Sequence, residues 1–263
     1  MEGTTTRVPA GYIAVAQFSD LPPAIVQRSK SFVLDTLGVG IYGTSLPWCE
    51  RLHATAEAME APDRAAVWCT PLKFSAPTAA MVNATAVQAF ELDDIGPGGH
   101  SDPVTLGSAL ALAPHASQSG NPLTGAALIN ALVVGIETAA RVNNCGGRVP
   151  NEALGFHGPG LYRTLGSVAS AANALGLSAD QTVHALGHAG QQAASLMFKH
   201  HGGMGKRSAR GAGRAPARSQ RCSRRTALTT RPMCSRLNTA GFARPILATS
   251  DRRSTISRKL RGD

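Results

Sequence analysis

The sequence is poor in aromatic side chains and in cysteine, and its cysteines form no paired motif. Aromatic residues make up 5% of the 263 positions. The five cysteines are odd in number, scattered and without a Cys-x-x-Cys pair: Cys49, Cys69, Cys145, Cys222 and Cys234. This usage argues against a disulfide framework and against a cysteine zinc site.

A secretion signal and a long uninterrupted apolar run are also missing. The N-terminus has no basic region followed by an apolar stretch and a cleavage site. The longest apolar run, Leu123–Val142, is interrupted by Asn130, Glu137 and Arg141, which is typical of a buried helix and not of a membrane span. We therefore expect a soluble, cytoplasmic protein.

Acidic residues are almost absent from the C-terminal part of the chain. Residues 1–207 contain 12 Lys and Arg and 14 Asp and Glu, whereas residues 208–263 contain 14 Lys and Arg and only Asp251 and Asp263. The formal charge of +10 therefore comes from the last 56 residues. We divide the chain into a domain at residues 1–207 and an Arg-rich tail at 208–263. The tail has little apolar surface, and we expect it to be disordered.

The domain at 1–207 shows a helical pattern of apolar residues, with Gly, Pro, Ser or Asn between the apolar segments. No alternation of strands and helices is visible, so the pattern predicts an all-α domain. Its predicted helices are Ala24–Tyr42, Ala76–Leu92, Leu106–Ala113, Gly125–Val142, Gly160–Leu175 and Ala179–Met197. The run Ala65–Cys69 is the best strand candidate. Ser178 and Gln181 have the spacing of a capping box at the start of the last helix.

Two segments carry residues suited to acid–base chemistry. Glu91-Leu-Asp-Asp94 stands at a predicted helix end, just before a glycine-rich stretch that contains His100. The C-terminal end of a helix carries partial negative charge, so three carboxylates there are unfavourable unless something compensates for them. The segment is therefore either a functional site or a solvated acidic loop. His157 stands between glycines ahead of an apolar helix, and a histidine there either moves a proton or is a surface residue.

A third segment is the glycine-rich, cationic stretch that contains His200, His201, Lys206 and Arg207. Lys206 and Arg207 suit an anionic substrate, although a solvated loop fits equally well. Adjacent histidines point in different directions and make poor joint metal ligands, and the P-loop pattern is absent. His184 and His188 are four residues apart on one predicted helix but lack a third ligand. We expect no metal and no cofactor.

Taken together, these segments resemble the MmgE/PrpD family, which includes 2-methylcitrate dehydratase and cis-aconitate decarboxylase. The similarity runs from about Ala14 to Arg207. The segments that carry it are Phe32–Gly38, Ser75–Ala84, Phe90–Asp94 with His100, Gly155–His157, Thr164–Leu177, Ala185–Ala193 and Gly205–Arg207.

The resemblance implies an all-helical domain, a second and smaller α/β domain, a homodimer and no obligatory metal. It places Glu91, Asp94, His100, His157 and Lys206 in the pocket. This chain departs from the family pattern at three positions. Many members have Asp, Thr and His where this chain has Glu91, Ile95 and Gly96. The implied activity is that of a lyase acting on a small polycarboxylate such as 2-methylcitrate.

The residue types fit that chemistry. Removing water from a hydroxy-polycarboxylate requires a base for the proton α to a carboxylate and an acid for the departing hydroxyl. His100 and His157 suit either role. Lys206 and Arg207 suit binding of carboxylates and stabilisation of the developing enolate charge.

The basic tail has two interpretations. It could be an arm that binds nucleic acid through phosphate contacts, but it has one aromatic residue, Phe242, and no Lys/Arg repeat. Alternatively, it is translated out of frame. Met233–Ser250 can be encoded by DNA that, read from its third base, gives VFEAQYGGFCATYSGDV, which contains the YGGFC-type motif of the family.

We therefore hypothesise a frameshift after Arg207. In this interpretation the chain is a truncated family member and is expected to be inactive, and nucleic acid is not its expected partner. Resequencing the gene around codon 207 tests the hypothesis.

Overall fold

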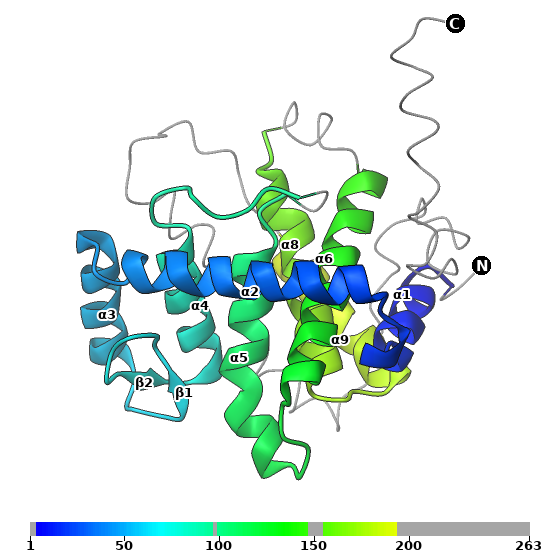
Figure 1. Ribbon diagram of the computed structural model, residues 1–263, viewed down its shortest axis with the longest axis horizontal. Coiled ribbons are helices and arrows are strands. Elements are labelled where there is room, and N and C mark those ends of the chain that lie inside the picture. The colour runs from blue at the N-terminus through cyan, green and yellow to red at the C-terminus, as the bar shows by residue number, and fades with distance from the viewer. Residues whose placement is uncertain (1–3, 97–98, 147–154, 194–263) are drawn as a thin grey trace, which may run out of the picture.

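The computed structural model describes residues 4–96, 99–146 and 155–193, and this part of the chain is almost entirely helical (Figure 1). The helices and the short 3₁₀ helix η1 are α1 (Thr4–Val15), η1 (Phe18–Asp20), α2 (Pro23–Gly43), α3 (Pro47–Met59), α4 (Ala76–Val87), α5 (Asp102–Gln118), α6 (Gly125–Gly146), α8 (Gly158–Ala174) and α9 (Ala179–Gln192). Two short antiparallel strands, β1 (Ala65–Ala66) and β2 (Lys73–Phe74), form the β-structure of the described residues. The predicted all-α fold is confirmed.

The predicted segments all contain a described element, with changed boundaries. The expected strand Ala65–Cys69 is confined to β1, because Cys69 takes a left-handed backbone with φ of 54°. The helix predicted over Ala76–Leu92 ends at Val87, and the one predicted over Leu106–Ala113 extends to the whole of α5. Helices α1 and α3 were not predicted. The tail and the last predicted residues of α9 lie outside the described residues.

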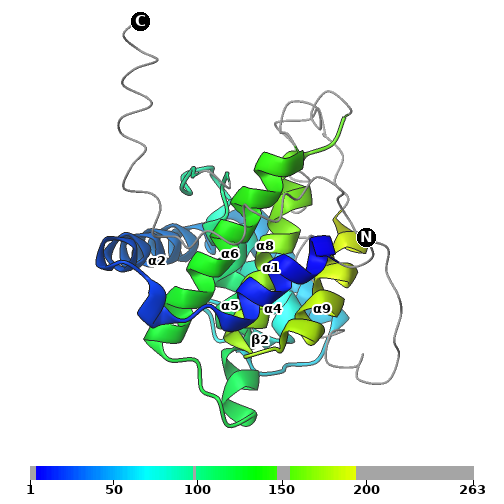
Figure 2. The ribbon, with the colours of Figure 1, turned by 90° about the vertical axis from the view of Figure 1, so that its right-hand side faces the viewer.

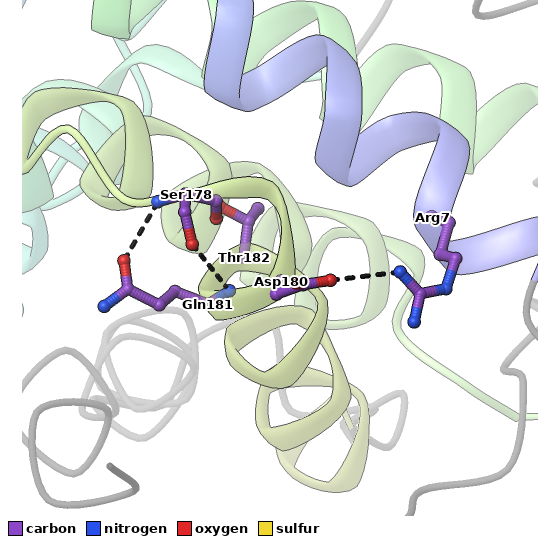
Figure 3. Close-up of polar contacts among 5 residues, drawn as sticks. All are labelled: Arg7, Ser178, Asp180, Gln181 and Thr182. Atoms are coloured by element: carbon purple, nitrogen blue, oxygen red, sulfur yellow. Dashed lines mark hydrogen bonds and ion pairs between the residues drawn. The ribbon is translucent and has the colours of Figure 1, made fainter.

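The start of α9 confirms the predicted capping box (Figure 3). Ser178 Oγ accepts a hydrogen bond from the Gln181 backbone N–H at 3.3 Å, and Gln181 Oε1 accepts one from the Ser178 backbone N–H at 2.9 Å. The two bonds satisfy donors that a helix start otherwise leaves open. The neighbouring Asp180 reaches Arg7 of α1 at 3.0 Å, on the surface between the two helices.

Helices α6 and α8 form the centre of the bundle and lie side by side in both views (Figures 1 and 2). Their backbones touch where two glycines meet. A Cβ added to Gly135 would lie 2.9 Å from the carbonyl oxygen of Gly166, and one added to Gly166 would lie 2.7 Å from that of Gly135. Any larger residue at either position would therefore push the helices apart.

Helix α6 is also the one stretch among the described residues that is long and apolar enough to cross a membrane, at Gly125–Cys145. Half of that stretch is buried inside the protein, against α5 and α8. Such packing is that of a core helix, as the interrupted apolar run predicted.

A pair of asparagines ties α1 to the bundle centre. Asn130 of α6 donates to the carboxamide oxygen of Asn173 on α8 at 2.9 Å and to the Ala16 carbonyl at 2.8 Å. Asn173 donates to the carbonyls of Ile13 at 2.9 Å and Ala16 at 3.2 Å. Side-chain donors thus satisfy carbonyls at the C-terminal end of α1 that the helix itself leaves open.

Candidate active site

The acidic loop begins where α4 ends, and the helix ends earlier than predicted. Gln88 caps α4 in a non-helical conformation, and Glu91 takes a left-handed φ of 63°. The three carboxylates therefore lie beyond the last helical turn. Since helix-dipole effects decline within that turn, opposition to the dipole does not explain the loop.

Burial distinguishes the three carboxylates. Glu91 is exposed and Asp94 is half-buried, whereas Asp93 is only 7% exposed. Asp93 was not among the predicted site residues, because spacing alone does not rank neighbouring carboxylates. A buried carboxylate requires hydrogen bonds or a cation, so Asp93 shows where the loop makes its internal contacts.

Those contacts reach His100. Gly96 and Gly99 exchange two backbone hydrogen bonds, of 3.1 and 2.8 Å, which fold the loop back on itself before α5. His100 follows directly, and its Nδ1 lies 3.1 Å from Oδ2 of Asp93. Gln88 donates from Nε2 to the same Oδ2. Asp93 therefore lies between the end of α4 and the imidazole of His100.

His157 lies at the N-cap of α8 and is half-buried. Gly155, two residues earlier, has a φ of 83°, a conformation that glycine adopts without strain. The His157 carbonyl accepts a hydrogen bond from the backbone N–H of Gly160 at 2.9 Å. This side chain therefore stands at the positive end of the α8 dipole, which favours negative charge nearby.

Tyr162 of α8 connects the two histidine segments. Its ring extends back over the start of its own helix, because a Cβ on Gly158 would lie 3.2 Å from its Cε1. Its hydroxyl reaches the other loop, where a Cβ on Gly99 would lie 2.6 Å from the hydroxyl oxygen. The glycine before His100 and the glycine after His157 thus contact the same buried ring.

The next residue of α8 makes a second connection. Arg163 is 3% exposed, and its Nη1 donates to Oε1 of Gln88 at 3.4 Å. Gln88, Tyr162 and Arg163 were not predicted as site residues. A Tyr-Arg pair inside the otherwise apolar helix of residues 160–175 was the available signal, since a buried Arg needs an acceptor.

The other predicted site residues are not brought to this place by the described residues. Lys206 and Arg207 lie outside the described residues, as do His200 and His201. His184 and His188 lie on α9, with His184 exposed. Across residues 4–96, 99–146 and 155–193, no three His, Cys, Asp or Glu side chains are grouped as metal ligands.

The fold and the site define a class: a helical domain in which His100 precedes α5 beside a buried carboxylate, His157 caps α8, and a buried arginine of α8 reaches the end of α4. Imidazole nitrogens can donate and accept protons, which is the chemistry that general acid–base catalysis requires. Comparison with known proteins makes the class specific. The MmgE/PrpD N-terminal domain model matches residues 9–226. The chain therefore belongs to the MmgE/PrpD family.

The matched range begins before Ala14 and continues beyond Arg207, so it is wider than the segment on which the sequence resemblance was based. Among curated proteins, the chain is 30% identical over 210 residues to a cis-aconitate decarboxylase-like protein, oryM, of Aspergillus oryzae, covering 78% of this chain and 44% of that one.

Two further relatives are named cis-aconitate decarboxylase. That of Aspergillus terreus is 30% identical over 192 residues, which are 72% of this chain and 39% of the relative. That of Mus musculus is 32% identical over 179 residues, which are 67% of this chain and 36% of the relative. The chain spans less than half the length of these relatives.

Proposed function

We propose that this chain carries the N-terminal part of an MmgE/PrpD-type lyase that dehydrates or decarboxylates a small polycarboxylate such as 2-methylcitrate or cis-aconitate. Family membership and the names of the relatives support the reaction class. The observation that carries the proposal is the pair of histidines, His100 and His157, whose loops meet at Tyr162.

Both reactions need proton transfers that imidazoles can perform. In dehydration, a base takes the proton α to a carboxylate, the C–H electrons form the double bond, and an acid protonates the hydroxyl that leaves as water. In decarboxylation of an unsaturated acid, loss of CO₂ leaves an electron pair on carbon that an acid must protonate. We assign these transfers to His100 and His157 jointly.

We also propose roles for the remaining pocket residues that the resemblance implies. Glu91 and Asp94 belong to the acidic loop that carries His100, and Lys206 and Arg207 would bind substrate carboxylates. Two cations there would offset the charge that develops on an enolate. We propose no metal or cofactor, and we expect turnover to persist in EDTA.

The test is a direct assay. A chain whose reading frame is restored after Arg207 would be incubated with 2-methylcitrate and, separately, cis-aconitate, with products followed by proton NMR and CO₂ release. His100→Gln and His157→Gln should each lower kcat about 10²- to 10⁴-fold, the range for loss of a general acid or base. His184→Gln, at an exposed position of α9, is the matched control and should leave turnover unchanged. Equal turnover by all three variants would refute the proposal.

The frameshift hypothesis makes a separate claim, that the chain as written is inactive. A chain whose reading frame is restored after Arg207 should turn over substrate, and the present chain should not. Equal turnover by the two would refute this claim and leave the family proposal standing.

We propose a homodimer as the working form, as the resemblance implies, and the cytoplasm as its location. Light scattering of the frame-restored protein should give twice the chain mass, and a single-chain mass would refute the dimer. The location is tested by fractionation after lysis. The protein should stay in the soluble fraction, and its absence from that fraction would count against the assignment.

A further inference from the structure

A continuous chain of polar side chains runs beneath His100. It starts at Arg163 of α8, passes through Gln88 at the end of α4 and Asp93 of the acidic loop, and ends at the imidazole. Gln88 is 0% exposed, and Arg163 and Asp93 are almost as deeply buried. By contrast, the side chain of His100 is 18% exposed, so the chain of contacts connects the interior to the site.

The hydrogen-bonding capacity of each group gives this chain a single direction. A guanidinium only donates, so Gln88 accepts from Arg163 through Oε1 and presents its NH₂ group on the other side. A carboxylate only accepts, so Asp93 receives that NH₂ at Oδ2. The amide orientation of Gln88 is thereby determined by its two neighbours.

The same argument extends to the imidazole. Nδ1 of His100 faces Oδ2 of Asp93 at 3.1 Å, and an unprotonated Nδ1 would place its lone pair against those of the carboxylate. The Nδ1–H direction is not aligned for a hydrogen bond in this structure, and Oδ1 of Asp93 has no hydrogen-bond partner among the described residues. A small rotation of the carboxyl or the ring would bring Nδ1–H onto a carboxylate oxygen.

We infer that Asp93 is a positioning residue that, supported by Gln88 and Arg163, holds neutral His100 as the Nδ1–H tautomer. Nε2 is then the nitrogen that accepts a proton from substrate and returns it. The catalytic meaning of this inference rests on the proposed function, whereas the tautomer does not. A buried carboxylate that fixes the tautomer of an imidazole increases the fraction of histidine ready to act as base.

The test reads the tautomer without substrate. The full chain, labelled with ¹⁵N-histidine, would be studied by long-range ¹H–¹⁵N correlation at about pH 8, where an ordinary imidazole is neutral. Absence of one signal set in His100→Gln identifies His100. We expect a protonated Nδ1 and an unprotonated Nε2. A protonated Nε2 in the unmodified chain would overturn the inference, whatever the variants do.

Asp93→Ala removes the acceptor, and the His100 signals should change to those of the Nε2–H tautomer. Asp35→Asn, on the exposed face of α2, is the control and should leave them unchanged. Retention of Nδ1–H in folded Asp93→Ala would overturn the inference. If that variant does not fold, the unmodified chain decides: an exchange-protected proton on Nδ1 supports the inference, and its absence overturns it.

Activity distinguishes this inference from the proposed function. In a frame-restored protein that turns over substrate, Asp93→Ala should lower kcat about 10-fold or more with little change in KM, as a part of the roughly 10²- to 10⁴-fold that the acid or base itself contributes. If no form shows turnover but the tautomer is as expected, the proposed function fails and Asp93 keeps its positioning role. If turnover is present with the opposite tautomer, only the inference fails.

Discussion

Replacement of Gly99 by Ala is the sharpest test of how the two histidine loops meet. Gly99 has a φ of 67°, and an alanine there costs about 1–2 kcal/mol in the left-handed region. Its Cβ would also lie 2.6 Å from the Tyr162 hydroxyl oxygen, which is inside van der Waals contact. The buried ring rests on Gly158 and has little room to swing away, so overpacking adds about 1–3 kcal/mol. We expect a loss of about 2–5 kcal/mol in the free energy of unfolding.

The two contributions can be separated by matched variants. Gly120→Ala has the same backbone penalty, since its φ is 77°, but its Cβ would meet nothing within 4 Å. In a Tyr162→Phe background the nearest atom to the Gly99→Ala methyl is Cζ at 3.5 Å, an ordinary contact. The loss should then fall to about 1–2 kcal/mol.

Urea unfolding followed by far-UV circular dichroism measures these differences as shifts in the midpoint at constant slope. Each kcal/mol corresponds to about 2–4 °C in Tm for a protein of this size. If Gly99→Ala and Gly120→Ala lose the same stability, or if Tyr162→Phe gives no relief, the loops do not meet at the tyrosine and the site geometry is wrong.

Three further predictions concern the scaffold. Asn173→Ala removes three hydrogen bonds and should lower the free energy of unfolding, measured in urea, by about 3 kcal/mol. The control Asn144→Ala changes an exposed residue and should cost about 0.5 kcal/mol or less. Equal losses would contradict the role assigned to Asn173. Burial lowers the pKa of His53, so the folded state resists protonation and its stability should fall as the pH drops below the ordinary value of about 6.5. The urea midpoint should therefore be lower at about pH 5 than at about pH 7.5, and His53→Gln should make this difference smaller. An unchanged difference would count against this explanation. Ser178→Ala should cost about 1 kcal/mol and Ser178→Asn much less, as measured by Tm, because asparagine also caps helices.

The sequence predicts the apolar helices well, because each presents its own pattern to the core. Helices α2, α6 and α8 start within two residues of the predicted positions. Helix α1 escapes prediction because it opens with three threonines and contains Pro9, both unfavourable to helix formation. It is stabilised by contacts from α9 and from Asn130 and Asn173, which are distant in sequence.

The candidate site is only partly readable from the sequence. The two histidine segments were found because glycines and helix starts surround them. Asp93 was overlooked beside Asp94, because only the fold decides which carboxylate turns inward. The early end of α4 has the same origin: the apolar pattern continues past Gln88, but the buried contacts of Gln88 with Asp93 and Arg163 require the chain to leave the helix.

The close contact of Gly135 with Gly166 has a consequence for how this family can diverge. Because the two backbones touch, α8 cannot turn about its axis, and the directions of His157 and Tyr162 are set by their distance in sequence from Gly166. Inserting or deleting one residue between His157 and Gly166 would rotate the site by about 100° relative to the core. Insertions and deletions among family members should therefore accumulate ahead of Gly155, where they do not change the direction of His157 and Tyr162 relative to the core.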